Sequence, residues 1–516
     1  MLDRLFGYKV HSFLHVLGMS VLAFGLPLNK VLMSIGAIWG VSNLVLEGEI
    51  KTYWLNIQKN TPFKWLLAFC FIHIIGIFWS TDIPYALHDI QIKLPLLAVP
   101  LALVARPITK RNHIHFIFYA LLVSLLITSF LNFGYYQQWF GVKNYTDIRQ
   151  LSLFGSHIRY GILIALGASI CVYFIYYKIN TKLNWIWIII LIWFCFYTFY
   201  SQVLSGVLSL LIIFFVLLLF YSSKYSKLLP WIFGIVLISG AYGLFLFLQP
   251  KKSQEVNISN LPLKTKEGNL YTNDFSNPNR ENNKPIFISV CDVELEREWN
   301  KISPILYDKR DYKGQFIKHT LIRYLASKGL TKDAEGIKSL NKSDIKNIEN
   351  GIASIEQLKS GLMSRLNDIK FQFNNSFDPN GHSILQRLEY WKTGLHILQK
   401  NYILGVGTGD VQLAFDKQYE KENSILLPQN RLRAHNTYIT VLVTFGIVGF
   451  TLFLGFLFSF FKLNFQNKEF VALMFFSVAI ATFFIEDTLE THMGVSIIAL
   501  FIGLFITKKE DSIAID

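Results

Sequence analysis

Charged residues are scarce in this 516-residue chain, in which only 16% of the residues are Asp, Glu, Lys or Arg. A soluble globular protein usually carries about 25%, and a coiled coil or a disordered chain carries more. Cysteine is rarer still: there are four, with no spacing typical of a disulfide-rich module or a zinc site. Glycine and proline lack the repeat of a collagen-like fibre. The chain is instead 52% hydrophobic and 16% aromatic, with a mean hydropathy of +0.37, which indicates an integral membrane protein.

Twelve apolar stretches are candidates for membrane spans, since a helix needs roughly 20 residues to cross about 30 Å of hydrocarbon. They lie at 11–28, 31–46, 64–79, 90–105, 113–133, 157–177, 185–200, 203–221, 229–248, 435–461, 470–485 and 492–507. The polar gap between the ninth and tenth carries helical patterns at 318–328, 343–366 and from Ser383 onward. We therefore expect an all-α polytopic protein of about twelve transmembrane helices. Its parts are an N-terminal membrane domain (1–248), a mainly helical loop domain (249–434) and a C-terminal membrane domain (435–516).

Lysine and arginine are distributed unevenly between the two ends of these spans. Sixteen fall on the side of the N-terminus and four, including Lys93, in the short loops of the other side. By the positive-inside rule both termini are cytoplasmic and the long loop is outside. That loop holds 28 basic and 22 acidic residues, so much of the net charge of +14 has a topological cause. A nucleic-acid partner is not expected.

An arginine stands near the outer end of the sixth span. Arg159 follows Gly155-Ser-His-Ile, and its planar fork suits phosphate oxygens. The alternative is an arginine that anchors the span at the interface. His157, two residues earlier, carries a weaker signal.

Two further candidates belong to the loop and the tenth span. Arg387 sits on the helix that begins at Ser383, where it either binds an anion or faces solvent. His435 follows Arg431 and Arg433 and precedes Asn436. The positive end of a helix dipole favours a neutral imidazole, which can accept a proton. A structural role for this lone interfacial histidine is the alternative.

Two other groups of residues have open interpretations. Glu486, Asp487, Glu490 and His492 cluster between the last two spans, where they pair with the arginines, contact an acceptor or form a solvated turn. The glycines of segment 405–409 either cradle an anion through backbone amides or form a turn. This segment lacks the lysine of a phosphate-binding loop.

The order of these motifs resembles the O-antigen ligase and polymerase superfamily. The similar segments are Gln386-Arg-Leu-Glu-Tyr-Trp391, Asn401-Tyr-Ile-Leu-Gly-Val-Gly-Thr-Gly409, His435-Asn436 and Gly446-Ile-Val-Gly449, within 383–450. The resemblance implies a GT-C-like membrane glycosyltransferase of lipopolysaccharide or polysaccharide biosynthesis in the bacterial inner membrane, with a periplasmic loop. Its donor would be an undecaprenyl-diphosphate-linked glycan and its acceptor lipid A-core, another glycan or a protein. No metal or cofactor is expected.

The resemblance also implies roles for individual residues. Arg159 and Arg387 would bind the diphosphate and His435 would activate the acceptor hydroxyl. Asn436, Arg431, Arg433, His157 and Glu486 would support them. Leu204 stands where the family often has an arginine, and 284–378 extends the usual loop. Ligase, polymerase and protein oligosaccharyltransferase remain open, and a twelve-span secondary transporter or an adhesion module are the rivals from other classes.

Overall fold

The computed structural model describes residues 7–141, 151–177, 181–226, 228–248, 261–277, 279–281, 284–358, 366–367, 369–372 and 378–507. Contacts between residues divide the chain into two compact units. The larger comprises Met1–Phe233, Trp391–Glu420 and Leu432–Asp516, and the smaller comprises Gly234–Tyr390 and Lys421–Arg431. This division reflects packing rather than lipid depth, so the boundaries at 248 and 434 stay predictions.

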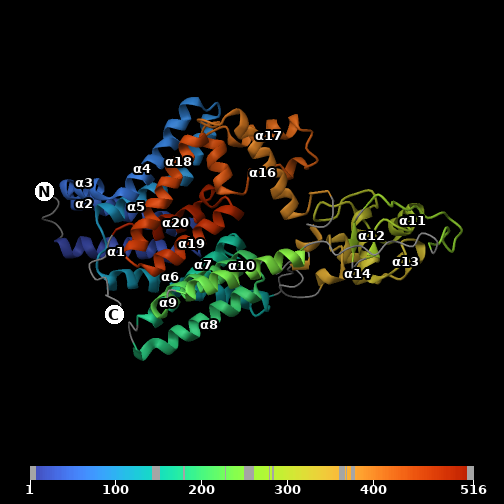
Figure 1. The fold of residues 1–516 in the computed structure, drawn as a ribbon, viewed down its shortest axis with the longest axis horizontal. Coiled ribbons are helices and arrows are strands. Elements are labelled where there is room, and N and C mark those ends of the chain that lie inside the picture. Colours follow the sequence, from blue (N-terminus) through green and yellow to red (C-terminus); the bar gives the residue numbers. More distant parts are fainter. Residues whose placement is uncertain are drawn as a thin grey trace. The chain divides into compact units, whose positions relative to one another are not determined.

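The described part of the larger unit is helical (Figure 1). Its helices are α1 (Tyr8–Gly25), α2 (Lys30–Glu47), α3 (Ile50–Lys59), α4 (Thr61–Ile75), α5 (Ile83–Ala105), α6 (Arg111–Tyr136), α7 (His157–Tyr176), α8 (Asn184–Tyr200), α9 (Leu204–Tyr225), α18 (Thr437–Gln466), α19 (Phe470–Ile485) and α20 (His492–Phe505). Three helices cross from one unit to the other: α10 (Leu229–Leu248), α16 (Ser383–Lys400) and α17 (Val411–Lys421). Single 3-10 turns lie at Gly76–Trp79, Thr181–Leu183, Pro428–Asn430 and Thr488–Glu490.

Each of the twelve predicted apolar stretches coincides with a helix, which confirms the all-α membrane class. Among the described residues, eight helices are long and apolar enough to cross a membrane. The others are shorter or less apolar; α19 has 16 residues and α20 has 14. Twelve crossings and an outer position of 249–434 stay predictions.

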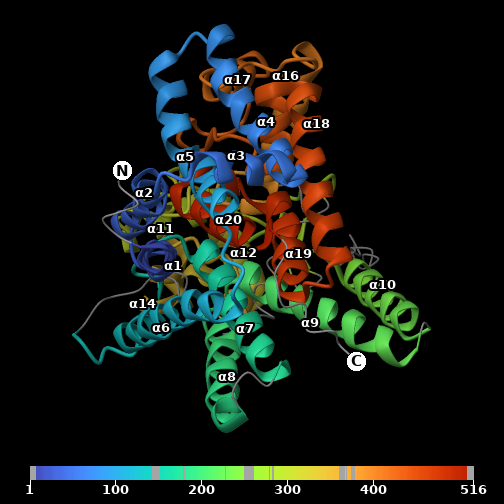
Figure 2. The ribbon, with the colours of Figure 1, turned by 90° about the vertical axis from the view of Figure 1, so that its left-hand side faces the viewer.

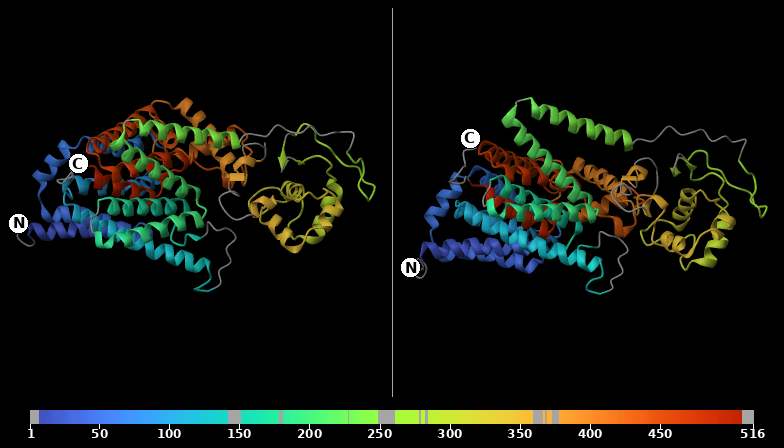
Figure 3. Two further views of the ribbon diagram at one scale, coloured as in Figure 1. Left: turned by 60° about the horizontal axis from the view of Figure 1, so that its bottom comes forward. Right: turned by 90° about the horizontal axis from the view of Figure 1, so that it is seen from below.

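Segments from both ends of the chain pack side by side in the larger unit. Helix α18 lies along α4, and α20 lies along α5 (Figures 2 and 3). Helix α7 packs against α8 and α9. The N-terminal and C-terminal helices therefore share one apolar core, which includes Phe69, Phe118 and Phe453.

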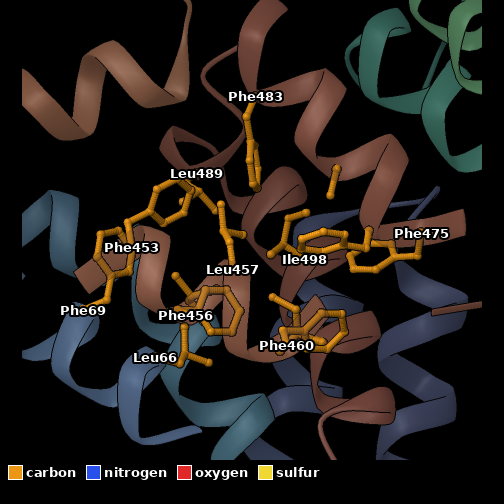
Figure 4. A pocket seen from close by; sticks show the side chains of 14 residues that line it. Leu66, Phe69, Phe453, Phe456, Leu457, Phe460, Phe475, Phe483, Leu489 and Ile498 are labelled. Carbon is orange, nitrogen blue, oxygen red and sulfur yellow. The ribbon is translucent and has the colours of Figure 1, made fainter. Parts of the chain in front are cut away.

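One cavity inside this core is a packing gap rather than a ligand site. It measures about 10 Å³ and is lined by 14 apolar side chains, among them Phe69, Phe456 and Phe483 (Figure 4). Its volume is about that of a single water probe, and a water there would need polar partners. The lining offers none.

Helix α5 begins seven residues before the predicted span 90–105. The carboxylate of Asp82 accepts a hydrogen bond from the Tyr85 N–H and caps the helix at Ile83. Lys93, which we assigned to an outer loop, is therefore inside a helix and buried. That assignment was wrong: Lys93 lies inside the predicted stretch 90–105, and it was counted with the loops because an unpaired charge is costly in a span, whereas its partner Asp89 lies just before that stretch.

The described smaller unit is a set of short helices around its own core (Figure 3). Its elements are β1 (Arg280–Glu281), β2 (Lys284–Pro285), α11 (Asp292–Ile302), α12 (Ile317–Lys328), α13 (Ala334–Lys338), α14 (Lys342–Glu349) and the 3-10 turn Ile355–Leu358. Strands β1 and β2 pair antiparallel. The predicted helix 343–366 ends early, at Glu349, since Gly351 takes a positive φ of 69°.

Candidate active site

His435 lies immediately before the capped start of α18. The side chain of Asn436 accepts a hydrogen bond from the Ile439 N–H, so Asn436 caps the helix, which begins at Thr437. His435 has a φ of 46°, in the left-handed region that non-glycine residues rarely adopt. Such a conformation persists only where the surrounding contacts hold it.

Asp487 supplies those contacts. Its carboxylate accepts hydrogen bonds from the His435 N–H at 3.0 Å, the Asn436 N–H at 3.1 Å and the Thr440 hydroxyl at 2.6 Å. Burial and the neighbouring Glu490 raise the pKa of Asp487, while Arg433 and the Thr440 hydroxyl oppose the rise. Asp487 thus ties the turn after α19 to the start of α18 and fixes the backbone of His435.

Glu486 brings the predicted histidine and one predicted arginine together. Its Oε1 accepts a hydrogen bond from Arg159 Nη2 at 2.9 Å, and its Oε2 lies 3.8 Å from His435 Nδ1. The hydroxyl of Thr437 donates to the Glu486 carbonyl at 2.9 Å. The Arg159 Nε is buried and has no hydrogen-bond partner within the part of the chain that the structure describes. The guanidinium therefore keeps a donor for an anion besides the one given to Glu486.

A second group of buried charges lies beside the same turn. Glu490 accepts a hydrogen bond from Arg433 at 2.8 Å and forms an ion pair with Lys93 at 2.8 Å, and Lys93 also binds Asp89 at 2.6 Å. Burial raises the pKa of Glu490, but Lys93 and Arg433 outweigh it, so the pKa lies below its usual value. Burial lowers the pKa of Arg433, but the carboxylate of Glu490 raises it by more, so the pKa lies above its usual value. This cluster ties α5 to the segment before His435.

The carboxylates around His435 already have donors. Glu486 contacts Arg159, Asp487 accepts two backbone N–H groups, and Glu490 lies between Lys93 and Arg433. Across the described residues no group of three or more His, Cys, Asp or Glu side chains is arranged to hold a metal ion. The arrangement suits binding of an anion near arginine beside an imidazole.

The segment 405–409 is a structural turn. The N–H groups of Val406 and Gly407 donate to the carbonyls of Val443 and Thr444, both at 2.9 Å, where α18 is broken by Gly446 with φ 60°. These two N–H groups therefore donate to α18 and are not available to bind an anion.

The same segment also binds the turn between α4 and α5. The Gly409 N–H donates to the Ser80 hydroxyl at 2.9 Å, and the Thr408 hydroxyl donates to the His73 carbonyl at 2.7 Å. Asp410 accepts hydrogen bonds from both the N–H and the hydroxyl of Thr81 at 2.9 Å. The glycine motif thus joins α18 to α4 and to the turn that follows α4.

The remaining predicted residues do not all meet in this cluster. His157 is the first residue of α7, two before Arg159. Arg387 and Arg431 belong to the smaller unit. There Arg387 donates to the Ser383 carbonyl at 3.2 Å and Arg431 to the Leu426 carbonyl at 3.1 Å. Arg387 as a diphosphate ligand stays a prediction.

From the sequence we missed the roles of three residues in this cluster, namely Asp487, Asp89 and Lys93. Asp487 was noted only as part of an acidic turn, and its hold on the His435 backbone has no signature in the sequence. Asp89 and Lys93 did have a signature in the sequence, because they are opposite charges spaced by four in an apolar helix. Such charges are costly unless they pair with each other or with a further partner. Glu490 is that further partner.

Residues 347–454 match the model of the O-antigen ligase family. By this match the segment resembles an O-antigen ligase domain. The match confirms the resemblance carried by the motifs of 383–450, all of which lie inside it. The comparison with curated proteins found no match to the chain.

The segment that matches the O-antigen ligase family contains only part of the charged cluster. His435 and Arg433 lie within the matched residues, whereas Arg159 and Glu486 lie before and after them. The contacts of Glu486 therefore join the histidine of that segment to an arginine contributed by the preceding membrane helices.

Proposed function

We propose that this protein transfers a glycan from an undecaprenyl-diphosphate donor to an acceptor hydroxyl at the periplasmic face of the bacterial inner membrane. Support comes from the O-antigen ligase domain, the apolar helices and the charged cluster at the start of α18. The observation that carries the proposal is the sharing of Glu486 by Arg159 and His435. This arrangement places Arg159, the proposed anion-binding group, beside His435, the proposed base.

His435 is the proposed general base. Glu486 faces His435 Nδ1, which would favour a proton on that nitrogen and leave Nε2 to accept one from the acceptor. The 3.8 Å separation is long for a hydrogen bond, and such contacts often shorten when substrate binds. As the acceptor oxygen bonds to the anomeric carbon, its proton passes to His435. The bond between that carbon and the diphosphate oxygen breaks, and the electron pair leaves with the diphosphate.

Arginine is the proposed partner of the leaving group. The free Arg159 Nε, together with the Arg159 donor bound to Glu486, would turn toward the diphosphate oxygens and offset their developing charge. Arg387 is proposed to bind the same diphosphate, on the strength of its place in the family motif. Divalent metals often fill this role elsewhere, and here we propose a metal-independent reaction.

We propose a single displacement with inversion. A double displacement needs a carboxylate free to attack the sugar, with a second acid nearby. The carboxylates around His435 instead accept hydrogen bonds from arginine, lysine or backbone N–H groups.

Transfer by the purified full-length protein in liposomes tests this function. A lipid-linked glycan is the donor and lipid A-core is the acceptor, with and without EDTA. We expect glycan-modified acceptor in both cases. Flux of a solute without any transfer would favour a transporter and contradict the proposal.

The acceptor separates the members of the superfamily. Gel profiles of a deletion strain should lose polymer attachment if the chain is a ligase and show single-unit glycans if it is a polymerase. Loss of glycosylated protein alone would indicate a protein oligosaccharyltransferase. We propose ligation, with lipid A-core as acceptor.

A further inference from the structure

A second hollow opens at the far end of α18 from His435. It has a volume of about 440 Å³ and lies between the ends of α3, α5, α18 and α20 and the start of α4, all in the larger unit. Its lining residues include Asn56, Lys59, Asn60, Thr61, Lys462 and Gln466. From its break at Gly446 to Gln466, α18 is about 30 Å long. The hollow and the candidate active site are therefore separate.

Two asparagines build the floor of this hollow. The Asn56 amide donates to the Ala105 carbonyl at the end of α5, and the Asn60 amide donates to the Ile506 carbonyl just past the end of α20, both at 2.9 Å. The oxygen of Asn60 accepts from the Phe63 N–H and caps α4. These bonds satisfy helix-end groups that would otherwise need water. The hollow is thus held open by side chains with fixed partners.

The charge of the lining has one sign. Lys59 and Lys462 are exposed, and among the residues that the structure describes no acidic side chain lines the hollow. Thr61 opens α4, so the positive end of that helix dipole faces the same space. The ends of α3, α5, α18 and α20 contribute negative partial charge, which the two lysines and the asparagine amides offset. The lining suits an anion with oxygen acceptors.

The surroundings indicate that this anion has an apolar tail. Val104, Pro107 and Leu463 form part of the lining. Large aromatic side chains stand exposed nearby on α3 and α18: Trp54 is 60% exposed and Phe458 68%. Exposed aromatics and lysines at the end of a long apolar helix are typical of the interface between lipid and water. We propose that the hollow binds the phosphate headgroup of an anionic phospholipid from the leaflet at this end of α18.

Lipid binding by the intact full-length protein tests the proposal. The protein, purified in a neutral detergent, is titrated with phosphatidylglycerol, with phosphatidylcholine and with glycerol phosphate, and bound molecules are counted by native mass spectrometry. We expect phosphatidylglycerol to bind most tightly. The double variant Lys59→Ala, Lys462→Ala should bind it about tenfold more weakly, since each lysine near a membrane surface contributes to attraction of anionic lipid.

Two further variants control for charge and folding. Lys59→Arg with Lys462→Arg should retain binding. Lys9→Ala with Lys51→Ala, which removes two exposed lysines outside the hollow, should bind as the wild type does. Equal binding of phosphatidylcholine, equal binding of glycerol phosphate, or an unchanged double alanine variant would each overturn the assignment.

Discussion

Arg159 and Glu486 form an ion pair of 2.9 Å although 327 residues separate them in the chain. The second oxygen of the same carboxylate lies 3.8 Å from His435. An arginine from a membrane helix and the histidine of the segment that matches the O-antigen ligase family are thereby held around one side chain. The proposed chemistry depends on this arrangement.

Replacement of Arg159 by lysine should lower glycan transfer by about tenfold or more, because an ammonium is a point charge and cannot offer the planar fork to two phosphate oxygens. Transfer is measured in membranes that contain equal amounts of variant and wild type. Arg111→Lys is the matched control, since Arg111 is paired with Glu469 at 4.0 Å outside the cluster. Wild-type transfer by Arg159→Lys would show that the arginine is only an anchor.

Asp487→Ala should destabilise the fold by about 3 kcal/mol, since it leaves two backbone N–H groups and a hydroxyl without their acceptor. Transfer per folded molecule should also fall, since the His435 backbone loses its restraint. Thermal unfolding in detergent and transfer at equal protein level check the two effects. Thr440→Val removes a single hydrogen bond and should lower the stability of the fold by about 1 kcal/mol. An equal loss of stability in both variants would contradict the role given to Asp487.

Gly446→Ala and Gly405→Ala should each lower the amount of folded protein. Both glycines have positive φ, and a Cβ would overlap the Ile403 carbonyl at Gly446 and the Thr444 backbone at Gly405. Strain in such a position costs about 1–3 kcal/mol before the overlap is counted. Gly234→Ala, with open space around its Cβ, is the control. Normal levels of both variants in the membrane would argue against the turn described for 405–409.

Glu490→Gln should destabilise the fold by about 3 kcal/mol at neutral pH, since Lys93 and Arg433 lose their shared anion. The lowered pKa of Glu490 means that its ionised form stabilises the fold fully above the ordinary value of 4.5, and that this contribution is lost as the pH falls toward the lowered pKa. The difference in Tm between wild type and variant should therefore shrink as the pH falls below about 4.5. A difference that grows in acid would contradict the sign of the shift.

Much of the fold could be predicted because apolar length alone marks a membrane helix. Every predicted stretch overlaps a helix. The clearest errors of prediction concern polar residues inside or beside such stretches. Lys93 was counted with the loops although it lies inside the predicted stretch 90–105, since an unpaired charge is costly inside a span. Its partner Glu490 is almost 400 residues away, and no local pattern indicates such a pair.

The residue types that meet around Glu486 could be proposed from the sequence, whereas their contacts could not. His435 and Arg159 were found from their charge near the ends of spans, and Glu486 was among the supporting residues. The left-handed backbone of His435 and its restraint by Asp487 arise from packing between α18 and the turn after α19. Such packing is set by tertiary contacts, which single-sequence patterns do not contain.

The most direct test of the account is glycan transfer in vivo by His435→Ala at a normal membrane level. A positioned general base contributes about 10²–10⁴ to a rate, so transfer should fall to about 1% of wild type or less. His492→Ala, whose imidazole contacts the Ser34 hydroxyl at 3.4 Å near the same turn, should retain transfer. Full transfer by His435→Ala would contradict the assignment of His435 as the base.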